Sequence, residues 1–469
     1  MNLHIPFDNS YARLPAQLFS KHAPTSVAAP RLVAFNRALA EQLGITGDAD
    51  DDTLAMIFSG NTLPPGAEPL AQLYAGHQFG NWNPQLGDGR AILLGEAKGY
   101  DIQLKGSGPT PYARRGDGRA WLGPVLREYV VSEAMHALGI PTTRALAAVE
   151  TGEDVYRESA LPGAVLTRVA SSHLRVGTFQ ILAARQDLSG LKALFEHAIS
   201  RHYPDAQTPT DFLRAVIDKQ AQLIAAWMSV GFIHGVMNTD NCAISGETID
   251  YGPCAYMDTY HPETVFSSID RQGRYAFSNQ PQIIVWNMAQ LATALIPLMP
   301  DAEAAVEEFT SAVHAMPKKI EGYWLNRFGA KIGLTSELQG DAELISDVLS
   351  LMAQDRLDFT NSFKALSGDS PVDHFTNRNA FLAWETRWRT RLAKETTAPT
   401  ETMDAANPVL IPRNHQIEQM IQSAVQGDYD PFHRLMQAYS APFEPNEAYS
   451  DLRKPPEEAE RVRATFCGT

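Results

Sequence analysis

Polar residues suited to phosphate and metal chemistry follow one another in the second half of the chain. His234 and Asn241 begin and end the stretch His-Gly-Val-Met-Asn-Thr-Asp-Asn, and Asp250-Tyr251-Gly252 comes shortly after it. Protein kinases carry a related order, H-R-D-x-x-x-x-N followed by D-F-G, in which the Asn and the second Asp bind metal. Amide and carboxylate oxygens suit Mg²⁺ or Mn²⁺, with phosphate and water completing the coordination. We therefore expect Asn241 and Asp250 to bind a divalent metal ion.

The comparison with kinases fails at one position. Val236 stands where a kinase has the Asp that accepts the proton of the acceptor hydroxyl. Asp240 lies beside Asn241 in the same stretch, and two interpretations are open for it. It is either a displaced base or a residue that contacts the metal ion through water.

Glycine and positive charge are concentrated in one part of the first half of the chain. Three G-x-G elements begin at residues 87, 106 and 116, and none has the third glycine of a dinucleotide-binding fingerprint. Each alone is typical of a tight turn. Residues 104–119 contain a cluster of Lys and Arg against a single acid, Asp117, in a chain of net charge −15. Because glycines let backbone N–H groups approach phosphate and cations neutralise it, this segment predicts an anion site.

A second pair of charged residues connects this segment to the kinase pattern. Lys105 ends a predicted strand, and Glu128 lies on the helix that is predicted to follow. Val131 and Met135 share the face of Glu128, so its carboxylate would lie among apolar side chains. An unpaired buried charge is costly, which makes Lys105 the natural partner of Glu128. Protein kinases hold nucleotide phosphates with a strand Lys and a helix Glu paired in this way.

The elements that must position these residues change in character along the chain. Residues 91–96 and 101–105 read as strands, and residues 122–138 as a helix. Farther along, the pattern is mostly helical, and residues 212–230 have long helical periodicity. We predict an α+β protein with a bilobal, protein-kinase-like fold, in which a smaller β-containing N-lobe precedes a larger helical C-lobe.

Four parts of the chain follow from this change in character. They are an N-terminal extension (1–69), the N-lobe with the nucleotide loop (70–176), the helical C-lobe with the catalytic and metal-binding loops (177–394), and a helical C-terminal extension with a tail (395–469). Residues 395–408 are rich in Thr, Ala and Pro, which indicates a linker. Residues 454–469 are charged, and we expect them to form a mobile tail.

The composition excludes several classes of protein. The 469 residues are 44% hydrophobic and 20% charged, and no apolar run approaches the ~20 residues of a membrane helix. The net charge of −15 argues against binding to nucleic acid or to an anionic membrane. Three cysteines and an N-terminus unlike a signal peptide indicate a reducing compartment, so we expect a cytoplasmic protein. The oligomeric state stays open, with a monomer as our working expectation.

Several long stretches carry a family resemblance. They are Tyr-Ala-Gly-His-Gln-Phe-Gly from Tyr74, Leu-Gly-Asp-Gly-Arg-Ala-Ile-Leu-Leu-Gly-Glu from Leu86, Leu-Lys-Gly-Ser-Gly from Leu104, the stretch from His234, and Asn-Pro-Val-Leu-Ile-Pro-Arg-Asn-His from Asn407. Through them the chain resembles, over nearly its whole length, the selenoprotein O (SelO/YdiU) family of kinase-like protein adenylyltransferases.

The resemblance implies a bilobal kinase-like fold that binds ATP in a flipped orientation. The α-phosphate then faces the acceptor, so that AMP passes to a Ser, Thr or Tyr hydroxyl of a protein and pyrophosphate leaves. This orientation accounts for the missing Asp at Val236. ATP is implied as the co-substrate and Mg²⁺ or Mn²⁺ as the cofactor, and the same apparatus would allow UMP transfer from UTP.

The resemblance also implies a role for each matching residue. The nucleotide-binding residues are Gly87, Gly89, Arg90, Lys105, Asp117, Gly118, Arg168, Arg175 and Asp250. Among them, Arg168 and Arg175 hold the terminal phosphates, and Lys105 pairs with Glu128. Asp240 is implied as the proton acceptor. Asn241 and Asp250 are implied as the metal ligands.

Two cysteines stand at positions that suggest redox control. Cys254 lies where kinases begin the activation segment, and Cys467 lies where eukaryotic members of the family carry selenocysteine. One hypothesis is a reversible disulfide between Cys254 and Cys467, because a cytosolic disulfide is more often regulatory than structural. The alternative is two unrelated free thiols. Cys242 is expected to be a small buried apolar residue.

Two other functions stay open on the sequence alone. One is a phosphotransferase of ordinary direction, which would move the γ-phosphate of ATP. The other is a nucleotide-binding scaffold, a pseudokinase without catalysis, which the valine at position 236 supports.

Overall fold

The computed structural model describes residues 3–466 and contains one eight-stranded sheet. In spatial order its strands are β1 (Phe19–Lys21), β3 (Leu70–Gln72), β6 (Ala91–Ala97), β7 (Tyr100–Lys105), β10 (Ala160–Ala170), β9 (Arg144–Tyr156) and β2 (Arg31–Phe35), with β8 (Ala120–Trp121) paired to β10. The strands predicted at 91–96 and 101–105 are confirmed as β6 and β7. β1 and β2 form the edges of the sheet, although the sequence assigns both to an N-terminal extension.

The register of the central strands places three polar side chains on one face of the sheet. β6 and β7 form an antiparallel hairpin in which Ala91 pairs with Lys105. β10 pairs with β7 so that Arg168 lies opposite Gln103. Since directly opposite residues share a face, and residues two apart in a strand share it too, Gln103, Lys105 and Arg168 project to the same side.

Helices cover both faces of this sheet. α3 (Leu122–Ala137) begins directly after β8 and packs against β9 and β10, on the side of Lys105. It confirms the predicted helix at 122–138 and carries Glu128. α1 (Arg37–Gln42) and α2 (Asp51–Phe58) join the apolar cluster on the opposite side, which contains Ile102 and Leu104 of β7.

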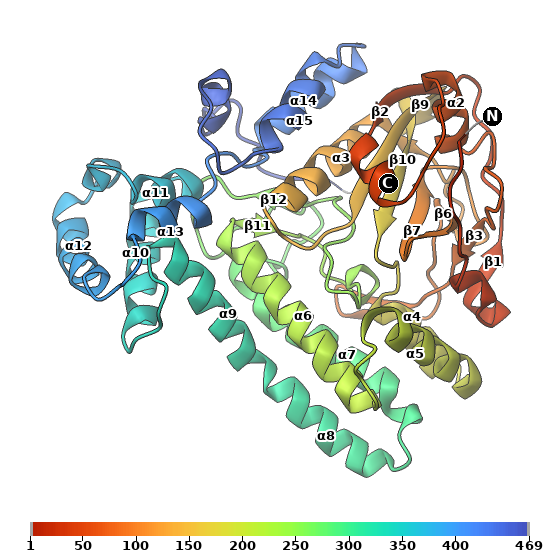
Figure 1. Cartoon of the computed structure of the whole chain (residues 1–469), viewed down its shortest axis with the longest axis horizontal. Helices are drawn as coiled ribbons and strands as arrows, with labels where there is room; N and C mark the ends of the chain where they lie inside the picture. The colour runs from red at the N-terminus through yellow and green to blue at the C-terminus, as the bar shows by residue number, and fades with distance from the viewer. Residues whose placement is uncertain (1–2, 467–469) are drawn as a thin grey trace.

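The middle of the chain is helical. Its helices are α4 (Val176–Ala184), α5 (Leu188–His202), α6 (Pro209–Ser229), α7 (Gln280–Leu295), α8 (Ala302–His314) and α9 (Met316–Lys331). α6 is the predicted long helix, and it packs against α7, α8 and α9 in the lower part of Figure 1. Its start is fixed by Thr208 and Asp211, which cap each other's backbone N–H groups. Within residues 3–466, no helix combines the length and apolar character needed to cross a bilayer.

A second apolar cluster lies beyond α9. It is built from α10 (Asp341–Asp355), α11 (Phe359–Ala365), α12 (Arg378–Leu392) and α13 (Pro399–Ala406), around the stacked rings of Trp384 and Trp388. The prediction of a linker at 395–408 is therefore wrong. Pro399 begins a helix, Met403 is buried in the cluster, and Asn407 donates to the carbonyl of Lys331 at 2.8 Å.

The C-terminal helices return to α3. α14 (Asn414–Val425) and α15 (Asp430–Tyr439) both pack against it, and Figure 1 shows them beside α3 at the upper side of the molecule. Arg127 of α3 forms an ion pair with Glu418 of α14. The ring of Tyr129 meets that of Phe432 of α15 edge to face, with centroids 5.6 Å apart. The helix that carries Glu128 is thus held between the sheet and the end of the chain.

The last described residues are docked, in contrast to the mobile tail that we predicted. Thr465 is buried, and its hydroxyl donates to the carbonyl of Pro253 at 2.5 Å. Its backbone N–H also donates to the carbonyl of Phe266 at 2.7 Å. Arg413, which is 1% exposed, pairs with Asp258 and Asp358. The contacts of Thr465 and of Arg413 therefore hold the segment that follows Asp250.

The packing of α15 on α3 is tested by the variant Phe432→Ala. Phe432 is 1% exposed, so loss of the ring should lower the free energy of unfolding by about 3–5 kcal/mol. Phe466→Ala is the matched control, because this ring is 70% exposed and its loss should cost about 0.5 kcal/mol or less. Denaturant unfolding followed by tryptophan fluorescence measures both. Equal midpoints for the two variants would contradict the packing role.

Candidate active site

A cavity of about 830 Å³ opens where the sheet meets the loops of the helical part. Its walls include most residues that the sequence singled out: Gly87, Gly89, Arg90, Lys105, Asp117, Gly118, Arg168, Arg175, Asp240, Asn241 and Asp250. Glu128 is not part of the wall, but it contacts two residues that are. The fold therefore brings these residues together from both halves of the chain.

Lys105 is the centre of a buried charge network. Its Nζ lies 2.5 Å from Glu128 Oε2 and 3.0 Å from Asp250 Oδ1. Glu128 also accepts from Arg168, whose Nη1 lies 3.3 Å from Oε1. The Glu128 side chain is 5% exposed, so its charge needs these partners.

The network controls the ionisation of Asp250. Burial opposes ionisation, but the charges of Lys105 and Arg168 outweigh it and hold the pKa of this carboxyl well below its ordinary value. Asp250 adopts a left-handed backbone conformation, with φ of 68°. A positive φ is uncommon for a non-glycine residue, and such conformations cluster at functional sites.

Asp88, which the sequence analysis passed over, links the arginines to the Gly-rich turn. Its Oδ2 accepts from Gln103 Nε2 at 3.0 Å, and Gln103 Oε1 accepts from Arg168 Nη2 at 2.6 Å. Asp88 Oδ1 lies 3.9 Å from Arg175 Nη2. The sequence signal that could have revealed Asp88 was an acidic residue between Gly87 and Gly89, in a part of the chain that is rich in Lys and Arg.

Arg175 is buried at the start of α4. Its Nε donates to the carbonyl of His173 at 3.1 Å, and its Nη1 donates to the carbonyl of Asp240 at 3.2 Å. The guanidinium lies 4.2 Å from the centre of the Tyr74 ring. Among the described residues, Nη2 has no hydrogen-bond partner, which leaves a donor for a bound anion.

The Gly-rich turn and the basic loop pack against each other. Gly87 has φ of 128°, and a Cβ there would lie 2.6 Å from the ring of Tyr112. Asp117 accepts two hydrogen bonds from Arg157, at 2.7 and 3.2 Å. Hydrogen bonding to Arg157 is the main reason that the pKa of Asp117 is lowered. Arg157 is a second cavity residue that the sequence analysis missed, because nothing in its surroundings resembles a motif.

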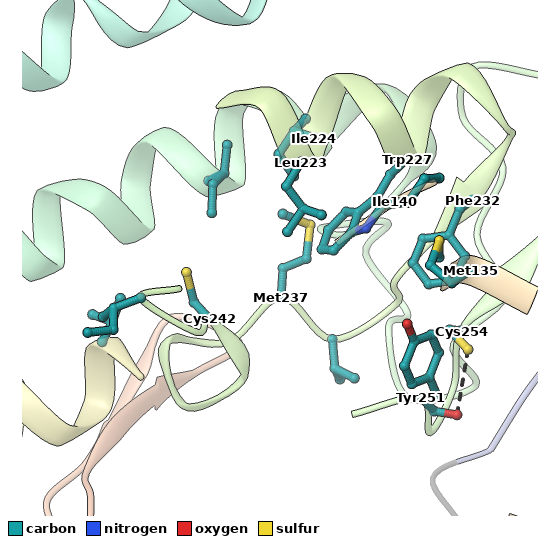
Figure 2. Close-up of a cluster of buried hydrophobic side chains, with 14 of the residues drawn as sticks. Met135, Ile140, Leu223, Ile224, Trp227, Phe232, Met237, Cys242, Tyr251 and Cys254 are labelled. Carbon is teal, nitrogen blue, oxygen red and sulfur yellow. Dashed lines mark hydrogen bonds between the residues drawn. The ribbon is translucent and has the colours of Figure 1, made fainter. Parts of the chain in front are cut away.

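Apolar residues anchor the loop between β11 (Phe232–Ile233) and β12 (Ala255–Tyr256). Figure 2 shows Met237 and Cys242 of this loop in a cluster with Trp227, Phe232 and Tyr251. His234 also belongs to the anchor, because its ring stacks on Trp227 and its Nε2 lies 2.9 Å from the carbonyl of Ile249. Buried side chains that precede and follow the polar residues of the loop therefore hold it in place.

Asp240 lies in the short 3₁₀ turn Thr239–Asn241 and is 7% exposed. Burial raises the pKa of this carboxyl to about 6, and a hydrogen bond from Gln78 partly offsets that effect. Gln78 Nε2 donates to Asp240 Oδ2 at 2.9 Å. A buried carboxylate on a cavity wall is a suitable proton acceptor.

Asn241 and Asp250 offer the oxygen ligands of a small divalent cation. Asn241 Nδ2 donates to the carbonyl of Val236 at 3.1 Å, which fixes the side chain that carries the amide oxygen. Within residues 3–466, no three His, Cys, Asp or Glu side chains form a metal cluster. The amide oxygen of Asn241 and the carboxylate of Asp250 are donor types that suit Mg²⁺ or Mn²⁺, with phosphate and water as the remaining ligands.

Cys254 is 1% exposed, and its Sγ lies 3.5 Å from the carbonyl of Tyr251, the contact dashed in Figure 2. Burial raises the pKa of its thiol to about 12. Cys467 lies outside the described residues. Cys242 is buried as expected, and burial raises its pKa to about 12 as well.

Comparison with known proteins assigns the family. The family model described as protein adenylyltransferase SelO matches residues 2–440. A protein nucleotidyltransferase YdiU of a Ruegeria species is 66% identical over 474 residues, with 100% of each chain covered. A YdiU of Roseobacter denitrificans is 63% identical over 474 residues, again with 100% of each covered. A YdiU of Rhizobium rhizogenes is 54% identical over 490 residues, covering 99% of this chain and 97% of its own. With its whole length matched, the chain belongs to the SelO family of protein adenylyltransferases and is a nucleotidyltransferase.

Proposed function

We propose that the enzyme transfers AMP from ATP to Ser, Thr or Tyr hydroxyls of proteins and releases pyrophosphate. The observation that carries this proposal is the pair of buried arginines, Arg168 and Arg175, on the same cavity wall as Lys105. The cavity is lined by eight Lys or Arg residues against four Asp residues, and this excess of positive charge favours a bound triphosphate. The family description supports the same reaction.

The proposal includes a kinase-like, bilobal arrangement with the parts 1–69, 70–176, 177–394 and 395–469. Its support is the contact between Lys105 on a strand and Glu128 on a helix, which protein kinases use to hold phosphates. In the proposed flipped orientation, the terminal phosphates of ATP lie against Arg168 and Arg175. The rest of the nucleotide contacts Gly87, Gly89, Arg90, Asp117 and Gly118 on the cavity wall.

The chemistry follows from this orientation. The acceptor oxygen bonds to the α-phosphorus, and the bond between that phosphorus and the oxygen leading to the β-phosphate breaks. Pyrophosphate leaves with the electron pair of the broken bond, and the acceptor proton passes to the Asp240 carboxylate. Lys105, Arg168 and Arg175 stabilise the negative charge that develops on the departing pyrophosphate. Asn241 and Asp250 would hold Mg²⁺ or Mn²⁺, which neutralises phosphate charge when bound.

We also propose that Cys254 and Cys467 form a reversible disulfide. Thr465 supports this proposal, because its hydroxyl donates to the carbonyl of Pro253. Pro253 directly precedes Cys254 in the chain, and Thr465 precedes Cys467 by two residues. Both thiols would be oxidised together, with the two electrons passing to a disulfide oxidant such as oxidised glutathione. The bond would tie the end of the chain to the segment that follows Asp250.

The competing functions are separated by the position of the label in ATP. We expect label from the α-phosphate to enter protein in the presence of Mn²⁺ or Mg²⁺, and EDTA to abolish the incorporation. Label entering from the γ-phosphate would instead establish ordinary phosphotransfer. No incorporation from either position, with the chain itself and mixed protein acceptors present, would favour the scaffold that Val236 suggests. UTP labelled at its α-phosphate tests UMP transfer in the same assay.

The role of Lys105 is tested by Lys105→Met. Loss of this cation should lower the rate of AMP transfer by about 100-fold or more, because it removes one of the two cationic partners of Glu128 and one of the three cations that stabilise the departing pyrophosphate. The matched control is Lys98→Met, at the exposed turn between β6 and β7. Initial rates at saturating ATP measure both variants. A Lys105 variant that stays folded and transfers AMP at the rate of the control would refute the assignment.

The disulfide is tested by peptide mapping under non-reducing conditions. After treatment with oxidised glutathione, we expect a linked pair of peptides that contain Cys254 and Cys467, and we expect reduction to separate them. Cys254→Ser should abolish the linked pair, whereas Cys242→Ser should leave it intact. A map that never contains the pair after oxidation supports two free thiols instead.

A further inference from the structure

The stretch Tyr74–Gly80, which the sequence resemblance marked but gave no role, forms half of a hairpin over the catalytic loop. β4 (Gly76–Gln78) and β5 (Asn81–Asn83) pair antiparallel and separately from the main sheet. The turn between them contains Phe79 and Gly80, both with positive φ. Tyr74, Gln78 and Phe79 line the same cavity as Asp240.

The backbone of this hairpin is bonded to the loop that carries Asp240. The N–H of His77 donates to Thr239 Oγ1 at 2.7 Å, and the N–H of Phe79 donates to Asn238 Oδ1 at 3.0 Å. Thr239 Oγ1 in turn donates to Gln180 of α4 at 2.7 Å. The hydrogen bonds of His77 and Phe79 therefore hold the hairpin against the catalytic loop.

Gly76 shows how close the two segments come. A Cβ at this position would lie 2.8 Å from Asp240 Oδ1 and 3.1 Å from Asp240 Cβ. Only a glycine fits there without displacing the carboxylate. The Asp240 side chain is thus enclosed on one side by the backbone of the hairpin.

Two side chains complete the contact. Asn83 Nδ2 donates to Gln78 Oε1 at 3.2 Å, and this bond sets which end of the Gln78 amide faces Asp240. Gln78 Nε2 then donates to Asp240 Oδ2 at 2.9 Å. Asp240 Oδ1 is buried and has no hydrogen-bond partner among the described residues. The orientation of the carboxylate therefore depends on Gln78.

We propose that Gln78 is a positioning residue for AMP transfer, and that it holds the Asp240 carboxylate in the plane in which it receives the proton of the acceptor hydroxyl. The inference rests on the proposed role of Asp240. Without the Gln78 amide, this carboxylate would lose its side-chain donor and rotate about its Cα–Cβ and Cβ–Cγ bonds. Misplacing a general base costs rate, whereas nucleotide binding by the cations elsewhere in the cavity stays unchanged.

The test compares Gln78→Met and Gln78→Glu with Gln85→Met. Methionine removes the donor, and glutamate keeps the shape of the side chain but presents a second carboxylate to Asp240. We expect both Gln78 variants to lower kcat for transfer from α-labelled ATP by about 10- to 100-fold, with KM for ATP unchanged. Gln85 is exposed and bonds only to Arg185 among its described contacts, so Gln85→Met should leave the rate unchanged.

A double-mutant cycle shows whether Gln78 acts through Asp240. In an Asp240→Ala background, Gln78→Met should have no further effect on the residual rate, because the group it positions is gone. Asn83→Ala, which only loosens the Gln78 amide, should give a smaller loss of kcat than Gln78→Met. This milder variant keeps the test available if Gln78→Met fails to fold.

Each outcome separates the inference from the function on which it rests. Wild-type kcat in Gln78→Glu, a parallel rise of KM for ATP, or full additivity with Asp240→Ala would overturn the positioning role alone. Undiminished transfer by Asp240→Ala would overturn the proposed role of Asp240, whatever the Gln78 variants do.

Discussion

The structure depends on a requirement that buried charges find partners. Lys105, Arg168 and Arg175 lie in one cavity wall, and each is an expensive charge to remove from water. Glu128, Asp250 and Asp88 compensate them through contacts that cross from strand to helix and from strand to loop. The sheet, α3 and the loop after β11 are therefore held in one relative placement by electrostatics as well as by packing.

The same requirement explains why α3 is so completely enclosed. Glu128 can bridge Lys105 and Arg168 only if the helix keeps its rotation and its distance from the sheet. β9 and β10 support one side of the helix, and α14 and α15 support another. The buried aromatic contact of Tyr129 with Phe432 and the ion pair of Arg127 with Glu418 fix its rotation from the outside.

Much of the candidate site was predictable because its residues belong to recognisable patterns within short segments of the sequence. The alternation of Gln103 and Lys105 in a strand, the helical face of Glu128, and the order of Asn241 and Asp250 are all properties of short segments. The roles of Arg168 and Arg175 were predicted only from the family resemblance, because nothing nearby in the sequence reveals that a residue after a strand will face a cavity.

What was missed depends on contacts between distant segments. Asp88, Gln78 and Arg157 acquire meaning only when the register of the sheet and the docking of the hairpin are known. The linker predicted at 395–408 failed for a related reason: Pro399 favours the first turn of a helix, and burial of Met403 stabilises it. The kinase-like division into lobes stays a prediction.

The support of α3 by the end of the chain has a consequence for the order of synthesis. Arg127 and Glu418 are 291 positions apart, so at about 5–20 residues per second the ribosome makes α14 roughly 15–60 s after α3. During that interval, the outer side of the helix that presents Glu128 has no cover from α14 or α15. A nascent chain therefore has its cavity fully braced only after α14 and α15 have been made, and products truncated before residue 414 lack that brace.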